Sequence, residues 1–596
     1  MSDKPSEGRF LDLVAERVVV FDGAMGTSIH AADLPLSDYR GLENCSEVLI
    51  ETRPDLIERI HRSFLEVGCD VVETNTFGAN KIVLAEFGLA ERTHELNVQA
   101  ARIARAACRA VETPAQPRFV AGSIGPGTKL ISLRQVDYDT LLDSYLAQVR
   151  GLLEGGVDIL LIETCQDILQ TKTAIEAARR AMHAVGRRVP LMCQVTMETT
   201  GTMLMGTDMA AAVVAIEAYP EVDVIGLNCA TGPQEMSAHV RYLAQYCARR
   251  LSVLPNAGLP QVVDGKPHFP LTPEELARWL REFVAVDGVN IVGGCCGTTP
   301  AHLKAVVDAV RGVRPRERRP VSEAQVSSLY SAVPLRQDNS FLIVGERCNT
   351  NGSRAFKRLL AEGDVEGMLA VAEEQIREGA HVLDVCVDYV GRDGVPDMQT
   401  VVSRFGSDVN IPLMLDSTEV PVIEAGLKLA GGKCIVNSVN LEDGEHKLEK
   451  ICRLLRQYGA AVVALTIDED PREAMAKTAE RKLEIASRLH DLLTRKYGIR
   501  EEDIFFDCLT FPITTGNAED RRLALETLDG IERVMKKFPR CQSILGVSNV
   551  SFGLEPAARV VLNSAFLHEA CLRGLTAAIV HAGKIVPRTQ IGDERW

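Results

Sequence analysis

Residues 289–297 read VNIVGGCCG, a short apolar run that ends in glycines and two neighbouring cysteines. It is the last of eight such runs in the first half of the chain, each apolar throughout and then small or polar. This pattern is typical of parallel strands that are covered on both faces. The other seven runs are RVVVFDG (17–23), CDVVETNTF (69–77), RFVAGSIGP (118–126), VDILLIETC (157–165), VPLMCQVTM (189–197), VDVIGLNCA (222–230) and LSVLPNAG (251–258).

Longer stretches rich in Ala, Leu, Glu and Arg separate these runs and are typical of helices. Eight strand–helix units in about 300 residues predict a (β/α)8 barrel. The alternative, a doubly wound open sheet, seldom carries eight consecutive units. The second half repeats the pattern with FLIVGER (341–347), HVLDVC (381–386), IPLMLDS (411–417), KCIVNS (433–438), AAVVALTID (460–468), DIFFD (503–507), SILGVSN (543–549) and LTAAIVHAGK (575–584).

The sequence therefore predicts an α/β fold of two tandem (β/α)8 TIM barrels. Residues 314–340 lie between the two sets of runs and are rich in Pro, Arg and Ser, which indicates a polar linker. We expect one domain over 1–313 and a second over 341–596. In such barrels, polar residues at the carboxyl ends of the strands share one mouth, where the chemistry takes place.

The composition excludes several classes of function. The 596 residues carry a formal net charge of -15, spread along the chain, which argues against nucleic acid or an anionic membrane as a partner. No apolar run approaches the roughly 18–20 residues that cross a bilayer. The first ten residues, MSDKPSEGRF, lack the apolar core of a secretory signal, so we expect a cytoplasmic protein.

Three cysteines are placed to converge in the first barrel. Cys295 and Cys296 are neighbours, and they can share a ligand only if the flanking glycines allow the backbone to turn. Cys229 ends the sixth strand, two strands away in a barrel. Three thiolates suit Zn²⁺, and an open fourth position is typical of a catalytic site.

Two other interpretations of this motif remain open. Glycine-rich loops late in a barrel often bind phosphate, which explains the glycines but not the cysteines. A redox-active pair of neighbouring cysteines would leave Cys229 without a role. A zinc ion with three thiolates would instead keep a bound substrate thiolate ionised, so the zinc interpretation predicts a thiol that is alkylated.

The strand ends of the second barrel carry acids and amides instead of cysteines. A carboxylate accepts two parallel hydrogen bonds from an amino-pyrimidinone edge, and amides suit ring nitrogens that both donate and accept. The set indicates a heterocycle site, although any single member could be a helix N-cap. Its members are Asn349, Asp384, Asp416, Asn437, Asp507 and Asn549.

Motifs of the first barrel resemble the homocysteine S-methyltransferase family over about residues 10–312. The resemblance implies that Cys229, Cys295 and Cys296 bind zinc and that homocysteine sulfur is the fourth ligand. We expect Asp22 and Glu163 near the substrate amino group, with helix or loop capping as the alternative. The motifs are DGAMGT (22–27), ETNTFGAN (73–80), GSIGP (122–126), IETCQD (162–167), GLNCATGP (226–233) and GGCCGTTP (293–300).

Motifs of the second barrel resemble the pterin-binding methyltransferase family from about 341 to 585. They are GERCNTNGSR (345–354), LMLDST (413–418), CIVNS (434–438), IFFD (504–507) and GVSNVSFG (546–553). The resemblance implies that Asp416, Asn437 and Asp507 hold the pterin ring and that Asn549 faces N5, where the methyl group leaves. Further folate-contact candidates are Gly352, Ser353, Arg354, Asp384 and Arg559.

One position departs from that family. The family commonly has Asp-x-Asn after the second strand, whereas this chain has Asp384, Val385 and Cys386. A thiol cannot replace the hydrogen bonds of an amide, so the role that the family gives this position does not carry over to Cys386.

Together the two barrels resemble the N-terminal half of cobalamin-dependent methionine synthases. This implies a methyltransferase that carries the methyl group of 5-methyltetrahydrofolate to homocysteine through cobalamin, with Asn549 and Asp416 as catalytic residues. No histidine stands in the Asp-x-His-x-x-Gly motif that ligates cobalt. We therefore expect the cobalamin on a partner module, and the chain to be truncated or one polypeptide of several.

Two alternative functions remain. A homocysteine methyltransferase fused to methylenetetrahydrofolate reductase would need flavin and would lack the GVSN and LDST motifs. The chain could also consist of homocysteine- and folate-binding modules that dock a corrinoid protein without turnover of their own.

Overall fold

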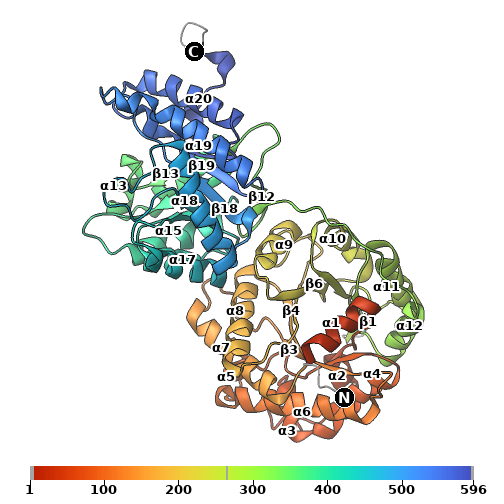
Figure 1. Cartoon of the computed structure of the whole chain (residues 1–596). Helices are drawn as coiled ribbons and strands as arrows, with labels where there is room; N and C mark the ends of the chain where they lie inside the picture. Colours follow the sequence, from red (N-terminus) through yellow and green to blue (C-terminus); the bar gives the residue numbers. More distant parts are fainter. Residues whose placement is uncertain (1–5, 264–265, 592–596) are drawn as a thin grey trace. The chain divides into compact units, whose positions relative to one another are not determined.

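The chain forms two compact units. The computed structural model describes residues 6–263 and 266–591 and divides the chain into Met1–Ser322 and Glu323–Trp596. In both units helices surround a central set of parallel strands (Figure 1). The predicted fold of two tandem (β/α)8 barrels is therefore confirmed.

The first unit has a parallel strand in each of the eight predicted runs. The strand order is β1-β10-β7-β6-β5-β4-β3-β2, and a parallel bridge between Phe21 and Val71 joins the two ends. A hairpin of β8 (Gln261–Val263) and β9 (Lys266–His268) follows β7. The barrel strands are β1 (Val19–Val20), β2 (Val71–Glu73), β3 (Phe119–Ile124), β4 (Ile159–Cys165), β5 (Leu191–Val195), β6 (Val222–Asn228), β7 (Arg250–Leu254) and β10 (Ile291–Val292).

Helices connect these strands, and their ends follow ordinary capping chemistry. Thr272 and Glu275 form a capping box at the start of α11, Pro273 is its first residue, and Gly288 ends it at φ +72°. The helices are α1 (Ser6–Glu16), α2 (Met25–Ala31), α3 (Leu49–Thr52), α4 (Pro54–Glu66), α5 (Lys81–Ala85), α6 (Thr93–Val111), α7 (Tyr138–Gly155), α8 (Ile168–Val185), α9 (Met209–Glu217), α10 (Pro233–Tyr246), α11 (Pro273–Asp287) and α12 (Pro300–Val310).

The interior of the first barrel is apolar at its amino end and polar at its mouth. Val71, Phe119, Leu161 and Val224 belong to one buried cluster, which Phe10 of α1 completes. Side chains two residues apart on a strand face the same way. Two or four residues further along the same strands, inward positions bring polar side chains to the mouth, and these are Glu73, Ser123, Glu163 and Asn228.

The second unit is a closed barrel in simple sequential order from β13 to β20. Each strand again overlaps one of the eight predicted runs, and β13, β16 and β19 extend beyond their runs by one or two residues. The strands are β13 (Leu342–Asn349), β14 (Val382–Cys386), β15 (Leu413–Asp416), β16 (Ile435–Val439), β17 (Ala461–Leu465), β18 (Ile504–Asp507), β19 (Gln542–Gly546) and β20 (Ala577–Val580). The helices are α13 (Arg354–Glu362), α14 (Val365–Arg377), α15 (Gly394–Asp408), α16 (Val420–Leu427), α17 (Glu445–Tyr458), α18 (Ala479–Asp491), α19 (Leu523–Lys537) and α20 (Pro556–Leu572).

The segment expected to be a linker, 314–340, is folded onto the barrels at both ends. On the first unit, the backbone N–H of Val321 donates to the carbonyl of Gln245 at 2.8 Å. On the second, β11 (Gln325–Ser327) pairs with β12 (Ala332–Pro334), and Val326 and Leu335 join the barrel core. Apolar residues within this polar stretch explain the difference, because they fill the amino end of the second barrel.

Across the residues that the structure describes, no helix has both the length and the apolar character needed to cross a bilayer.

Candidate active sites at the two barrel mouths

Three sulfur atoms meet at the mouth of the first barrel. Cys229 directly follows β6, and Cys295 and Cys296 follow β10. The Sγ atoms of Cys229 and Cys296 are 3.8 Å apart, and all three sulfurs lie within 4.8 Å of one another. All three residues are partly exposed. The predicted convergence of the three cysteines is thus present in the structure.

The backbone turns at both strand ends to bring the sulfurs together. Cys229 has a left-handed φ of 59°, which is uncommon for a residue with a side chain and is often found at functional sites. The N–H of Cys295 donates to the carbonyl of Pro255 at 2.8 Å, and the N–H of Cys296 donates to Oδ1 of Asn256 at 3.0 Å. These bonds to the loop after β7 fix the turn that lets neighbouring cysteines share one site.

The donor set of this cluster fits a soft divalent metal ion. Hydrogen bonding with the Cys229 thiol lowers the pKa of Cys296 and raises that of Cys295, so the sulfurs hold their protons unequally. A bound cation would favour ionisation of all three, because metal ligation requires thiolates. Three protein sulfurs leave one tetrahedral position for a substrate.

The two acids predicted near the substrate have hydrogen-bond partners within the barrel. Asp22 is buried and accepts from the backbone N–H of Glu73 at 3.1 Å, where β1 meets β2. Glu163 accepts from Ser123 Oγ and from Asn228 Nδ2, the latter at 3.1 Å. Burial raises the pKa of Asp22 well above its usual range and that of Glu163 to about 7. Neither acid caps a helix.

An amide at the mouth of the second barrel joins two of the predicted acids. Nδ2 of Asn349 donates to Oδ2 of Asp384 at 2.8 Å and to Oδ2 of Asp416 at 2.9 Å. Asp507, on β18, accepts from the N–H of Leu509 at 2.7 Å. Asn437 lies on β16, and Asn549 lies exposed on the turn after β19. The predicted ring residues thus all lie at the carboxyl end of this barrel.

Burial disfavours the ionised form of these carboxyl groups and so raises their pKa values. It raises the pKa of Asp416 to about 7, with nearby Asp388 adding to the effect, and raises that of Asp507 to about 6. The pKa of Asp384 is raised well above its usual range, first by burial and then by Asp416. Oδ1 of Asp384 is buried without a hydrogen-bond partner. A ligand with a fork of N–H donors would supply the missing partners.

Comparisons with known proteins find a relative for each of the two domains. Residues 19–310 match the family model "Homocysteine S-methyltransferase", and residues 345–581 match "Pterin binding enzyme". Methionine synthase of Mycobacterium tuberculosis is 50% identical over 588 residues, which are 98% of this chain and 49% of that protein. The chain belongs with the N-terminal regions of methionine synthases. It spans about half the length of the curated relatives it matches.

Two further relatives complete the comparison. Methionine synthase of Mycobacterium leprae is 49% identical over 593 residues, which are 98% of this chain and 49% of that protein. A homocysteine methyltransferase from Escherichia coli, solved in its metallated form, is 25% identical, with a TM-score of 0.42 over 50% of this chain and 98% of that one.

In the homocysteine S-methyltransferase domain, Glu73 is a mouth residue that is absent from the predicted site. This residue ends β2 and lies at the mouth with Asp22 and Glu163. The sequence does contain a pattern that could have identified Glu73. It is the first polar residue after an apolar run, and Asp22 was predicted from the same feature.

In the pterin-binding domain, some folate-contact candidates have structural roles. Ser353 caps α13, because its Oγ accepts from the N–H of Phe356 at 3.2 Å. Gly352 and Arg354 are exposed beside it. Cys386, where the family commonly has Asn, is buried with its Sγ 3.6 Å from Nδ2 of Asn351.

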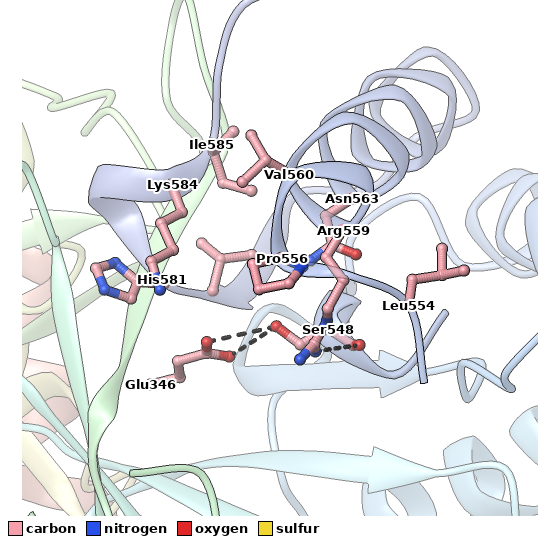
Figure 2. A pocket seen from close by; sticks show the side chains of 11 residues that line it. Glu346, Ser548, Leu554, Pro556, Arg559, Val560, Asn563, His581, Lys584 and Ile585 are labelled. Carbon is pink, nitrogen blue, oxygen red and sulfur yellow. Dashed lines mark hydrogen bonds between the residues drawn. The ribbon is translucent and has the colours of Figure 1, made fainter. Parts of the chain in front are cut away.

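Arg559 and Ser548, the residue before Asn549, both line a cavity of about 330 Å³ (Figure 2). The Arg559 guanidinium donates to the carbonyl of Ser548 and to Oγ of Ser551, each at 3.1 Å. Ser548 in turn donates to the carboxylate of Glu346. Arg559 therefore holds the turn that carries Asn549.

Proposed function

We propose that this chain transfers the methyl group of 5-methyltetrahydrofolate to homocysteine, forming methionine and tetrahydrofolate, through cobalamin held by a separate module. The convergence of Cys229, Cys295 and Cys296 at one mouth carries this proposal, because it fits a site that activates a thiol. The acid and amide ring at the other mouth supports the folate half of the reaction. The family membership of each domain agrees with this division.

At the first mouth, the three cysteines would hold Zn²⁺. The ion would supply Lewis acidity that keeps the sulfur of homocysteine ionised and nucleophilic at neutral pH. Asn228 links this cluster to the acids, since its Nδ2 donates to Glu163 and lies 4.0 Å from Sγ of Cys295. This link supports a role of the carboxyl groups in orienting the amino end of the substrate while its sulfur faces the cysteines.

At the second mouth, Asp416, Asn437 and Asp507 would hold the pterin ring. Asn349 fixes the carboxyl of Asp416 by a hydrogen bond, so the acceptor is oriented before the ligand arrives. When the methyl group leaves N5, its bonding electron pair stays on nitrogen, and N5 must gain a proton because an anionic amine is a poor leaving group. An amide at Asn549 would stabilise the charge that develops there.

A reducing compartment such as the cytoplasm suits this chemistry. All sixteen cysteines are free in the structure, and a thiolate site needs reduced sulfur.

Two half-reactions test the proposal on the whole chain. The purified protein should methylate free cob(I)alamin from methyltetrahydrofolate, and should methylate homocysteine from free methylcobalamin. Binding of both substrates with no turnover in either assay would contradict the proposal and support the alternative of two binding modules that dock a corrinoid protein.

A further inference from the structure

A cavity of about 290 Å³ lies at the amino end of the first barrel, opposite the mouth that holds the three cysteines. Arg17, Asp70 and Arg118 line it, and each stands shortly before a strand, β1, β2 or β3. Arg311, the residue after α12, lines its rim. The charged residues of the lining are therefore three arginines and one aspartate. This is an excess of two positive charges on a chain with a formal net charge of -15.

The one carboxylate of the cavity is already neutralised by Arg17. The guanidinium of Arg17 donates to Oδ1 of Asp70 at 2.7 Å and to Oδ2 at 2.9 Å. Oδ2 also accepts from the backbone N–H of Val20 at 3.0 Å. Both oxygens of Asp70 are thus used by short hydrogen bonds, and a paired fork of this kind is the strongest form of the contact.

Arg118 is buried beside this pair without a close counter-ion. Its side chain is only 7% exposed, and its Nη1 lies 3.5 Å from Oδ1 of Asp70. Its Nη2 lies 3.5 Å from Oε1 of the exposed Gln116, and its Nε has no hydrogen-bond partner. A guanidinium has five N–H donors, so two are used at the outer limit of a hydrogen bond and three are unused. A buried charge in this state is costly unless an anion compensates it.

Other arginines at this end of the barrel have an evident structural role. Arg17 donates to the carbonyl of Val18 at 2.8 Å, and Arg105 donates to the carbonyl of Gly156 at 3.2 Å. Within 6–263 and 266–591, no backbone carbonyl accepts from Arg118. The side chain is therefore not explained by bonds to the chain ends around it, and its place at a cavity indicates a ligand.

We propose that this cavity binds a phosphate dianion, with Arg118 as the buried anchor and Arg17 and Arg311 at the rim. Guanidinium forks match the oxygens of phosphate, and the two excess positive charges match the two charges of the dianion. The ligand is a free phosphate ion or the phosphate group of an ester. The site lies at the end of the barrel away from the cysteines, so it does not depend on the proposed function.

Phosphate titrations of the whole chain test this site. Binding of inorganic phosphate and of glycerol 3-phosphate is measured by calorimetry, with chloride keeping the ionic strength constant. Tighter binding of glycerol 3-phosphate identifies an ester as the ligand, and tighter binding of inorganic phosphate identifies the free ion. Arg118→Met replaces the guanidinium by an apolar side chain and should weaken binding of both by about 10- to 100-fold, the range for a charge-assisted hydrogen bond.

Thermal melting without phosphate separates a binding role from a structural one. Arg118→Met should leave the melting temperature unchanged or raise it, because it removes a buried charge that lacks a counter-ion. Arg105→Met is the matched control, since Arg105 is paired with Asp158 and with the carbonyl of Gly156 outside the cavity. It should lower the melting temperature and keep the phosphate affinity.

A variant at the rim keeps the test decisive if Arg118→Met does not fold. The side chain of Arg311 is 72% exposed, so Arg311→Ser leaves the core intact and should weaken phosphate binding by about 2- to 5-fold. Unchanged phosphate affinity in Arg118→Met, or in Arg311→Ser where Arg118→Met does not fold, would overturn the site, as would absence of binding to the wild type. A phosphate-free melting temperature of Arg118→Met as low as that of Arg105→Met would make Arg118 a structural residue and also overturn the proposal.

Discussion

The hydroxyl of Ser548 donates to the carboxylate of Glu346, with 3.1 Å between Oγ and Oε2, and thereby ties the turn after β19 to β13. Asn549 is the next residue on that turn, so its amide is held indirectly by the first strand of the barrel. Arg559 holds the same turn from α20 through the carbonyl of Ser548 (Figure 2). The residue proposed to face N5 is thus exposed but anchored from two sides.

Loss of the Glu346 anchor should slow methyl transfer more than it weakens folate binding. Ser548→Ala removes one hydrogen bond that orients the Asn549 turn, which corresponds to about 2- to 10-fold in kcat. Transfer from methyltetrahydrofolate to cob(I)alamin at saturating folate measures this effect. Asn563→Ala changes another residue that lines the same cavity, serves as the control and should leave kcat unchanged. An equal loss in both variants would make the effect one of cavity shape.

Removal of the Asn549 amide should have a larger effect. If this amide stabilises charge at N5 in the transition state, Asn549→Ala should lower the transfer rate on the order of 10²-fold, with folate affinity much less affected. Stopped-flow transfer rates and a separate folate-binding titration measure the two quantities. Equal losses in both would show that Asn549 is a simple pterin contact.

The barrel folds could be predicted because their signal is repeated and local. Sixteen apolar runs each became a strand, since a strand covered on both faces needs apolar residues throughout. The hairpins β8–β9 and β11–β12 were not predicted, because their strands do not lie in long apolar runs like those of the barrels. Val326 and Leu335 were not predicted to be buried, because the segment 314–340 is mostly polar. Their burial depends on contacts with barrel residues that lie as far along the chain as Ala577.

Those parts of the candidate sites that depend only on the order of the strands in the barrel could be predicted from the sequence. Cys229 and Cys295 lie at the ends of strands two apart, so a closed barrel brings them together whatever their surroundings. The partners of Glu163 come from β3 and β6, and no pattern in the sequence pairs Ser123 or Asn228 with that carboxyl. Such cross-strand hydrogen bonds depend on register, which the sequence did not show.

Zinc should be held in a ratio of about one ion per chain and should depend on each cysteine. Replacing Cys229 by Ala leaves two sulfurs and should lower zinc affinity and abolish homocysteine methylation, because a tetrahedral site with an open position needs three protein ligands. Metal analysis and the methylcobalamin assay measure both effects. Methylfolate demethylation should survive as the internal control. Stoichiometric zinc in a Cys295→Ala, Cys296→Ala double variant would show that the metal binds elsewhere.

Methylfolate binding should weaken as the pH falls below about 7. The pKa of Asp416 is raised to about 7, so below this pH the Asp416 carboxyl of the free protein is protonated. Because the carboxylate must accept two N–H donors from the pterin ring, the carboxyl has to release that proton when methylfolate binds. The dissociation constant should rise by up to about tenfold per pH unit on the acid side, and level off above pH 7. Asp416→Asn has no such proton and should bind weakly with a flatter profile. A wild-type profile that strengthens in acid would contradict this assignment.

The two units should fold and act separately when the chain is divided between Ser322 and Glu323. The structure gives a reason for this point: Val321 is hydrogen-bonded to the first unit, while β11 begins at Gln325 and fills the core of the second. A cut within β11 would expose the amino end of the second barrel. We expect two stable pieces, each with its own cooperative melting transition.

Each piece should retain its own half-reaction, because the methyl group is proposed to travel on cobalamin and not through the protein. The N-terminal piece should methylate homocysteine from free methylcobalamin, and the C-terminal piece should demethylate methyltetrahydrofolate with free cob(I)alamin, both without mixing. A second division after residue 328, which leaves β11 on the wrong piece, should destabilise only the C-terminal piece, since Val326 would leave its core. If both pieces aggregate alone after either cut and recover only on co-expression, the two barrels depend on each other for folding, and the separation argued from their closed cores is wrong.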